Sequence, residues 1–149
     1  MYTRDHLLLS VVVGSLVVLV GATPLSPAVA VAAAVVAGTA IDVDHFVVAR
    51  LRTGSWRAAR GAIRHPRRLL FDQDAIFAEG EVGVLHRLLS HALLAGVVVG
   101  ALAVLAPAAV LVVGLSIYVH VVTDLVWDTA LVARVEKRDT DRPLRELVR

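Results

Sequence analysis

Two carboxylates and one imidazole close an otherwise apolar stretch of this 149-residue chain, at Asp42, Asp44 and His45. The residues from 27 to 49 around them are nearly all alanine and valine. Ionisable side chains are expensive to place at membrane depth, so they need a bound cation or paired polar groups there. We therefore expect other parts of the chain to bring partners to the same level.

The other apolar regions carry histidines and acids at helical spacings. His120, Asp124 and Asp128 follow one another at intervals of four residues, which places them on one face of a helix. His91 lies about 140° round a helix from His86, so the candidates cannot all point to one centre. The candidate metal ligands are His6, Asp42, Asp44, His45, His86, His91, His120 and Asp124.

These residue types suit a hard or borderline divalent ion. The chain has no cysteine, so any metal must be held by imidazole nitrogen and carboxylate oxygen. Zinc is the first expectation, with manganese and iron(II) as alternatives, and either one or two ions fit a helical bundle core. Such an ion can activate water as a nucleophile. Arg87 and Asp44 are the candidate catalytic residues, and Arg87 could pair with a phosphate oxygen.

Individual residues keep alternative roles. Asp42 and Asp44 could instead form salt bridges to Arg50 or Arg87 or be solvated at the interface, and His45 could orient Asp42 rather than bind the ion. Asp128, at the interface beside a tryptophan, is expected to pair or cap.

Long apolar segments must position these groups. The chain is 58% hydrophobic with a mean hydropathy of +0.76, which excludes an ordinary soluble domain. The runs predict an all-α, integral membrane four-helix bundle, with 1–149 as a single domain and spans at about 6–22, 27–49, 84–105 and 108–132. A signal peptide is the alternative interpretation of the first run.

Charge predicts the orientation of the spans. The net charge is only +2, but all 15 lysines and arginines fall on one side of the predicted bundle or at its boundary. The turns at 21–27 and 106–108 carry none. By the positive-inside rule, a multi-pass protein of the cell membrane with both termini in the cytoplasm is expected.

A polar segment at 50–83 lies on that same side. Its first half is basic and its second half acidic, with large apolar residues between. This pattern favours an interfacial amphipathic helix broken at Pro66 and lying on anionic headgroups of the lipid bilayer, with a solvated loop as the alternative. The charged C-terminal tail, 134–149, is expected to be a surface helix or a frayed end on the cytoplasmic side. No nucleic-acid motif is present, and no nucleic-acid partner is expected.

At these polar positions the chain resembles the YdjM-type family of inner-membrane metal-dependent hydrolases. The resemblance covers roughly residues 5–130 and departs from the family at Ala92, where a serine is usual, and at 39–41, where a proline is often found. It rests on His6, on Asp42-Val43-Asp44-His45, on His86-Arg87-Leu88-Leu89-Ser90-His91 and on His120-Val121-Val122-Thr123-Asp124. A distant similarity of that family to zinc-dependent phospholipases C implies phosphoester hydrolysis.

The sequence thus favours a membrane-embedded metal-dependent hydrolase acting on a phosphoester or other small-molecule or lipid-like substrate. A non-catalytic metal-binding protein, such as a carrier or sensor, is the second hypothesis. The third is a regulatory membrane adaptor that acts through 50–83 and the tail. The far halves of the spans carry no charge or histidine, which counts against a path for ions through the membrane.

Overall fold

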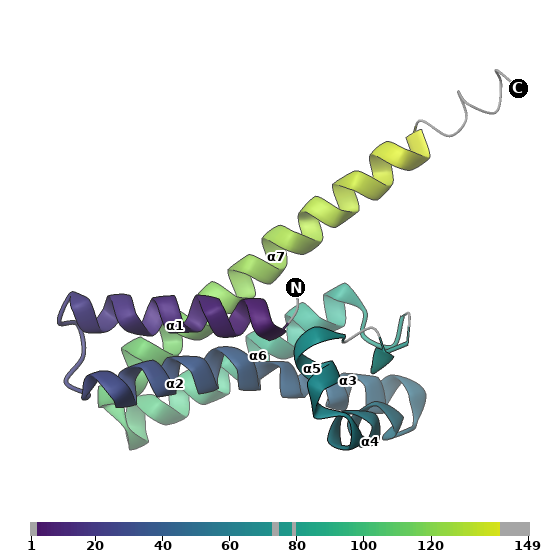
Figure 1. Cartoon of the computed structure of the whole chain (residues 1–149). Coiled ribbons are helices and arrows are strands. Elements are labelled where there is room, and N and C mark those ends of the chain that lie inside the picture. Colours follow the sequence, from purple (N-terminus) through teal and green to yellow (C-terminus); the bar gives the residue numbers. More distant parts are fainter. Residues whose placement is uncertain (1–2, 73–74, 79, 141–149) are drawn as a thin grey trace, which may run out of the picture.

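The first two helices form an antiparallel pair. The computed structural model describes residues 3–72, 75–78 and 80–140, which form helices joined by turns and contain no strand. Helices α1 (Thr3–Leu19) and α2 (Pro27–Ala40) lie side by side (Figure 1). Gly21, with φ of 67°, supplies the left-handed turn after α1, and Pro27 opens α2. The first helix therefore begins and ends slightly earlier than the 6–22 predicted.

A tight turn interrupts the second apolar helix at its polar end. The 3-10 turn η1 (Ile41–Val43) follows α2, and α3 (Asp44–Thr53) continues in the same direction until Gly54 ends it with φ of 72°. One uninterrupted helix over 27–49 was expected. Because a 3-10 turn has about 3.0 residues per turn rather than 3.6, η1 changes the face on which the following side chains lie.

The second half of the chain is a hairpin of two long helices. Helix α6 (Val84–Leu105) has the bounds predicted from the sequence, and Ala106 with η3 (Pro107–Ala109) connects it to α7. Helix α7 (Val110–Thr140) continues well past the expected end at 132, and its last turns project beyond the bundle (Figure 1). Part of the predicted tail is therefore helical, and residues 141–149 lie outside the described residues.

Within the part of the chain that the structure describes, three helical stretches are long and apolar enough to cross a membrane: Pro27–Thr53, Val84–Leu105 and Pro107–Arg134. Helix α1, with 17 residues, is shorter. Figure 1 shows the two short turns at one end of the molecule, while the start of α1, the start of α6 and helices α3 to α5 lie at the other. Helices α1, α2, α6 and α7 thus alternate in direction.

The 50–83 segment folds back on α3. It contains α4 (Arg57–Arg64) and α5 (Pro66–Phe71), so the predicted break at Pro66 is confirmed. The small-residue face of α4, Ala58 and Ala62, packs on Ala49 of α3 and on Ile76, so this face is turned to the protein. Arg57 bonds Glu81 at 2.7 Å and holds the pKa of that carboxyl below its usual value.

Close packing of small residues brings α1, α2 and α7 together. A core cluster joins Val17, Ala30, Ala34 and Val112. Deeper toward the polar end, the Ser116 hydroxyl donates to the Ala34 carbonyl at 2.7 Å and lies 3.2 Å from the Ser10 hydroxyl. A Cβ on Gly38 would collide with both serine oxygens, so only glycine allows this approach. These contacts fix the walls of the polar site that follows.

Candidate metal centre

Four ligand atoms from three elements converge in the core. Asp42 comes from η1, His91 from α6, and His120 and Asp124 from α7, and their candidate ligand atoms all lie within 4.8 Å of one another. His120 Nε2 lies 3.4 Å from Asp42 Oδ1, and His91 Nε2 lies 3.6 Å from the same oxygen. His91, His120 and Asp124 are almost fully buried. The set is a largely buried polar cluster.

The outer nitrogens of both imidazole rings are already used. His120 Nδ1 lies 2.8 Å from the Gly38 carbonyl, which can only accept, so this nitrogen carries the hydrogen. His91 Nδ1 donates in the same way to Asp44 Oδ2 at 2.6 Å. In the neutral rings both Nε2 lone pairs therefore face the centre, together with the Asp42 and Asp124 carboxylates. A divalent cation neutralises both acids and accepts from both rings, so the donor set fits a metal ion.

Asp124 is held from two sides. His6 Nε2 donates to its Oδ1 at 3.1 Å, and the His6 ring also stacks on His120 with centroids 3.7 Å apart. Arg87 Nε lies 3.7 Å from Asp124 Oδ2, and the same guanidinium bonds Asp128. The pairing role expected for Asp128 is thus observed. His6 and Arg87 contact the outer side of the cluster and orient the carboxylate that could bind an ion.

A second group shares one member with the first. Asp44, His45 and His91 also present atoms close enough for an ion. Asp44 Oδ1 and His45 Nε2 are buried and have no hydrogen-bond partner among the described residues. However, the Nδ1 atom of His91 is engaged by Asp44 and its Nε2 atom faces the first group. The structure thus brings together one set of four candidate ligands. Beside it lies a triad of candidate ligands that includes the same histidine, His91.

One of the candidate ligands named from the sequence lies apart from the cluster. His86, a predicted ligand, is exposed at the start of α6, with Nδ1 3.4 Å from Arg52 Nη1. The helical angle between His86 and His91 explains this, because α6 can turn only one of them inward. Asp72 is exposed in the polar segment, and Asp74 lies outside the described residues.

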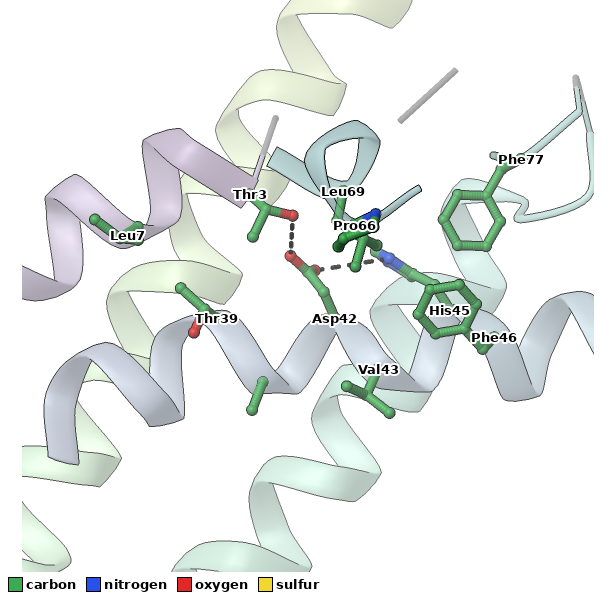
Figure 2. A pocket seen from close by; sticks show the side chains of 11 residues that line it. Thr3, Leu7, Thr39, Asp42, Val43, His45, Phe46, Pro66, Leu69 and Phe77 are labelled. Atoms are coloured by element: carbon green, nitrogen blue, oxygen red, sulfur yellow. Dashed lines mark hydrogen bonds and ion pairs between the residues drawn. The ribbon is translucent and has the colours of Figure 1, made fainter. Parts of the chain in front are cut away.

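The partners of Asp42 and Asp44 are mainly histidines rather than the arginines of the alternative hypothesis. Besides His91 and His120, Asp42 Oδ1 lies 3.7 Å from His45 Nδ1, and Thr3 donates to Asp42 Oδ2 at 3.4 Å (Figure 2). Asp44 bonds His91. Among the described residues, no arginine makes a direct bond to Asp42 or Asp44.

A pocket of about 270 Å³ reaches this cluster from the side of α1 and α5. Figure 2 shows Asp42 and His45 on its wall, with Leu7, Leu69 and Phe77 among the apolar residues around them. Phe77 meets the His45 ring edge-on, at 5.9 Å between centroids. The pocket gives a small, largely apolar route to one edge of an otherwise buried site.

Three supporting residues were not singled out from the sequence as parts of the site: Ser10, Gly38 and Ser116. The sequence does contain a pattern that could have identified them. Each lies four residues from a candidate ligand, and so on the same helix face: Ser10 from His6, Gly38 from Asp42, and Ser116 from His120.

Comparison with family models, with curated proteins and with solved structures found no match. The function is therefore argued from the geometry.

Proposed function

We propose that this chain is a membrane-embedded metal-dependent hydrolase of a phosphoester or lipid-like substrate. The observation that carries the proposal is the convergence of Asp42, His91, His120 and Asp124, with a pocket that opens on Asp42. The set of two imidazoles and two carboxylates suits zinc, manganese or iron(II), and we propose zinc as the first to test. One ion is expected at this set.

Each residue around the proposed ion has a definable task. Asp44 and the Gly38 carbonyl hold the Nδ1 hydrogens of His91 and His120, so that both Nε2 lone pairs point inward. His6 and Arg87 keep Asp124 directed at the centre. A divalent ion supplies, when bound, a lowered pKa for water and compensation for negative charge on ester oxygens. The protein contributes orientation and the exclusion of bulk water.

The pocket favours a hydrolase over a metal carrier. A zinc ion with four protein ligands is typical of a structural site, so catalysis at this set requires a further position for water or substrate beside the four residues. Here the Asp42 and His45 side of the cluster faces a hollow that is otherwise mostly apolar. A substrate with a polar ester next to an apolar portion matches that lining.

We also propose four membrane spans, with α1 as the shortest, and with both termini and the 50–83 segment in the cytoplasm. The exposed surface of α4 and α5 supports this side, since it combines arginines with large apolar side chains. Ile63 and Phe71 are among the most exposed large apolar residues of the segment, and Trp56 lies under the Arg50 guanidinium at 5.9 Å. Such a mixture suits anionic headgroups. We also propose membership in the YdjM-type family, which rests on the four sequence motifs alone.

The experiment is elemental analysis of the full-length protein in detergent, followed by assays with phosphodiester and phospholipid substrates. The wild type should carry about one divalent ion per chain and cleave at least one substrate, and Asp42→Asn should lose both. Asp72→Asn, which changes an exposed acid, is the matched control and should keep both. A metal-free wild type would overturn the proposal. Bound metal without turnover of any phosphoester would favour the non-catalytic metal-binding protein instead.

A further inference from the structure

A second hollow, entirely apolar, lies on the membrane face of the bundle. It has a volume of about 640 Å³ and lies between α2 with η1 on one side and α6 with α7 on the other. Its lining includes Ala37, Val43, Leu94, Val98 and Ile117, and no residue of the lining is polar. The volume falls within the roughly 300–1,000 Å³ that is typical of small-molecule sites.

The groove exists because α6 does not pack along α2. Helix α6 packs on α7, and near its start it also contacts η1 and α3. Only 6% of the apolar span in α6 is buried, against 33% in the other two candidate spans. None of the described residues therefore fills the gap between α2 and α6. At this depth the surrounding material is lipid hydrocarbon.

The groove ends at the candidate metal centre. Ile41 and Val43, at its polar end, flank Asp42 on η1. Leu94 lies one helical turn after His91, and Ile117 lies one turn before His120. The groove also shares Ala40 and Val43 with the pocket that exposes Asp42, so the two hollows adjoin around the outer side of η1.

The groove runs from the ligand cluster toward the end of the molecule that carries the short turns, where Ala109 is part of its lining. Its lining on the second helix runs from Ala33 to Val43, which is roughly 15 Å at about 1.5 Å per residue. An acyl chain that lies in the groove would place the ester end of its lipid beside the ligand cluster and its methyl end toward the end of the molecule that carries the short turns.

From this continuity we infer that the groove holds an acyl chain of a phospholipid substrate, which makes the substrate a membrane lipid rather than a soluble phosphoester. The inference rests on the proposed hydrolase function. Transfer of a chain from bilayer to groove gains little hydrophobic free energy, because both surroundings are apolar. The groove instead positions the chain, and the polar end of the lipid supplies the affinity at the cluster.

The test is photo-crosslinking in vesicles that contain a phosphatidic acid with a diazirine on one acyl chain, with labelled residues mapped by mass spectrometry. In the metal-loaded wild type, labels should concentrate on groove residues of α2, α6 and α7. Val98→Trp fills the groove and should reduce its labelling to the level found on open lipid-facing surface. Val97→Trp is the matched control, because Val97 is 68% exposed and lies outside the groove.

Elemental analysis of the same samples distinguishes failure of the groove inference from failure of the proposed hydrolase function. Val98→Trp should keep its metal, which shows that the variant is folded. If the metal-loaded wild type is labelled equally over all lipid-facing residues, or if Val98→Trp labels like Val97→Trp, the groove holds only bulk lipid and the inference is overturned. Crosslinks between two copies of the chain through the groove would overturn it in favour of a dimer. A metal-free wild type would instead overturn the proposed function.

Discussion

The Nε2 atoms of His91 and His120 lie 3.2 Å apart, while the Nδ1 atom of each ring is engaged on the outside. The two rings are thus turned toward one point by groups that need not contact an ion themselves. Asp44 does this for His91, and the Gly38 carbonyl does it for His120. The arrangement distinguishes residues that bind from residues that orient, and mutation can separate them.

Asp44→Ala should weaken metal binding without abolishing it. The substitution removes the acceptor of the His91 Nδ1 hydrogen, so the ring can rotate or change tautomer. Loss of such an outer partner typically costs about 10–100-fold in metal affinity. Titration against a competing chelator measures the change. Asp42→Ala should lose binding at all concentrations tested, and Asp72→Ala, which alters an exposed acid, should match the wild type.

If Asp44→Ala abolished binding as completely as Asp42→Ala, Asp44 would be a ligand itself. The neighbouring triad of Asp44, His45 and His91 would then be the occupied site. Retention of wild-type affinity would show that the bond from His91 to Asp44 does not set the geometry of the ring.

Much of the fold follows from hydrophobic run length and from breakers. The bounds of α6 were predicted because an apolar run lies between Gly83 and the Ala106-Pro107 turn. The 3-10 turn at Ile41–Val43 could not be predicted, since nothing local distinguishes it from the adjoining helices. Tertiary contacts select it: there Asp42 meets histidines from α6 and α7.

The residue types of the candidate site could be predicted from the sequence, but which of them point to a common centre could be predicted only in part. Helical spacing placed His120 and Asp124 on one face, and the angle between His86 and His91 indicated that one of them must point away. Which of the two is turned inward depends on how α6 packs on α7, and the sequence does not encode that locally. The support from Ser10 and Ser116 was missed because serines in apolar helices usually bond their own backbone.

Gly38→Ala should destabilise the bundle. A Cβ at this position would collide with Ser10 Oγ and come within 2.8 Å of Ser116 Oγ, so α1, α2 and α7 must separate. Overpacking of this kind typically costs about 1–3 kcal/mol. Unfolding in detergent measures the loss, which should be partly restored in the double variant Gly38→Ala/Ser10→Ala.

The matched control is Gly96→Ala on α6, where an added Cβ would meet no atom within 4 Å. Alanine favours helix over glycine by up to about 1 kcal/mol, so this variant should be as stable as the wild type or slightly more stable. Equal losses at both glycines would contradict the close contact at Gly38.

Acid should loosen the loop that carries Glu81. Arg57 lowers the pKa of Glu81 in the folded protein, so the contact stabilises the fold at pH values above the ordinary pKa of a glutamate. That contribution is lost as the pH falls through the lowered pKa. Hydrogen exchange of the Ala78 amide, which donates to Glu81 at 2.8 Å, reports the change. Glu81→Gln should lack the pH-dependent loss of protection, and an identical profile in both proteins would contradict the assignment.

Arg87→Gln should be strongly destabilising, because it leaves the buried Asp128 carboxylate without its cation. Arg87 bonds Asp128 and also lies 3.7 Å from Asp124 Oδ2. Removal of one partner of a buried ion pair typically costs about 3–5 kcal/mol, whereas neutral replacement of both is often tolerated. The double variant Arg87→Gln/Asp128→Asn should therefore recover much of the free energy of unfolding.

A double-mutant cycle in detergent isolates this pair, and metal titration of the same proteins assigns the second contact of Arg87. If Arg87 also orients Asp124, the stability-restored double variant should still bind metal more weakly than Asp128→Asn alone. Equal affinities in these two proteins would mean that Arg87 serves only Asp128. An additive cycle, with no recovery in the double variant, would contradict the ion pair itself, because two independent residues cannot rescue one another.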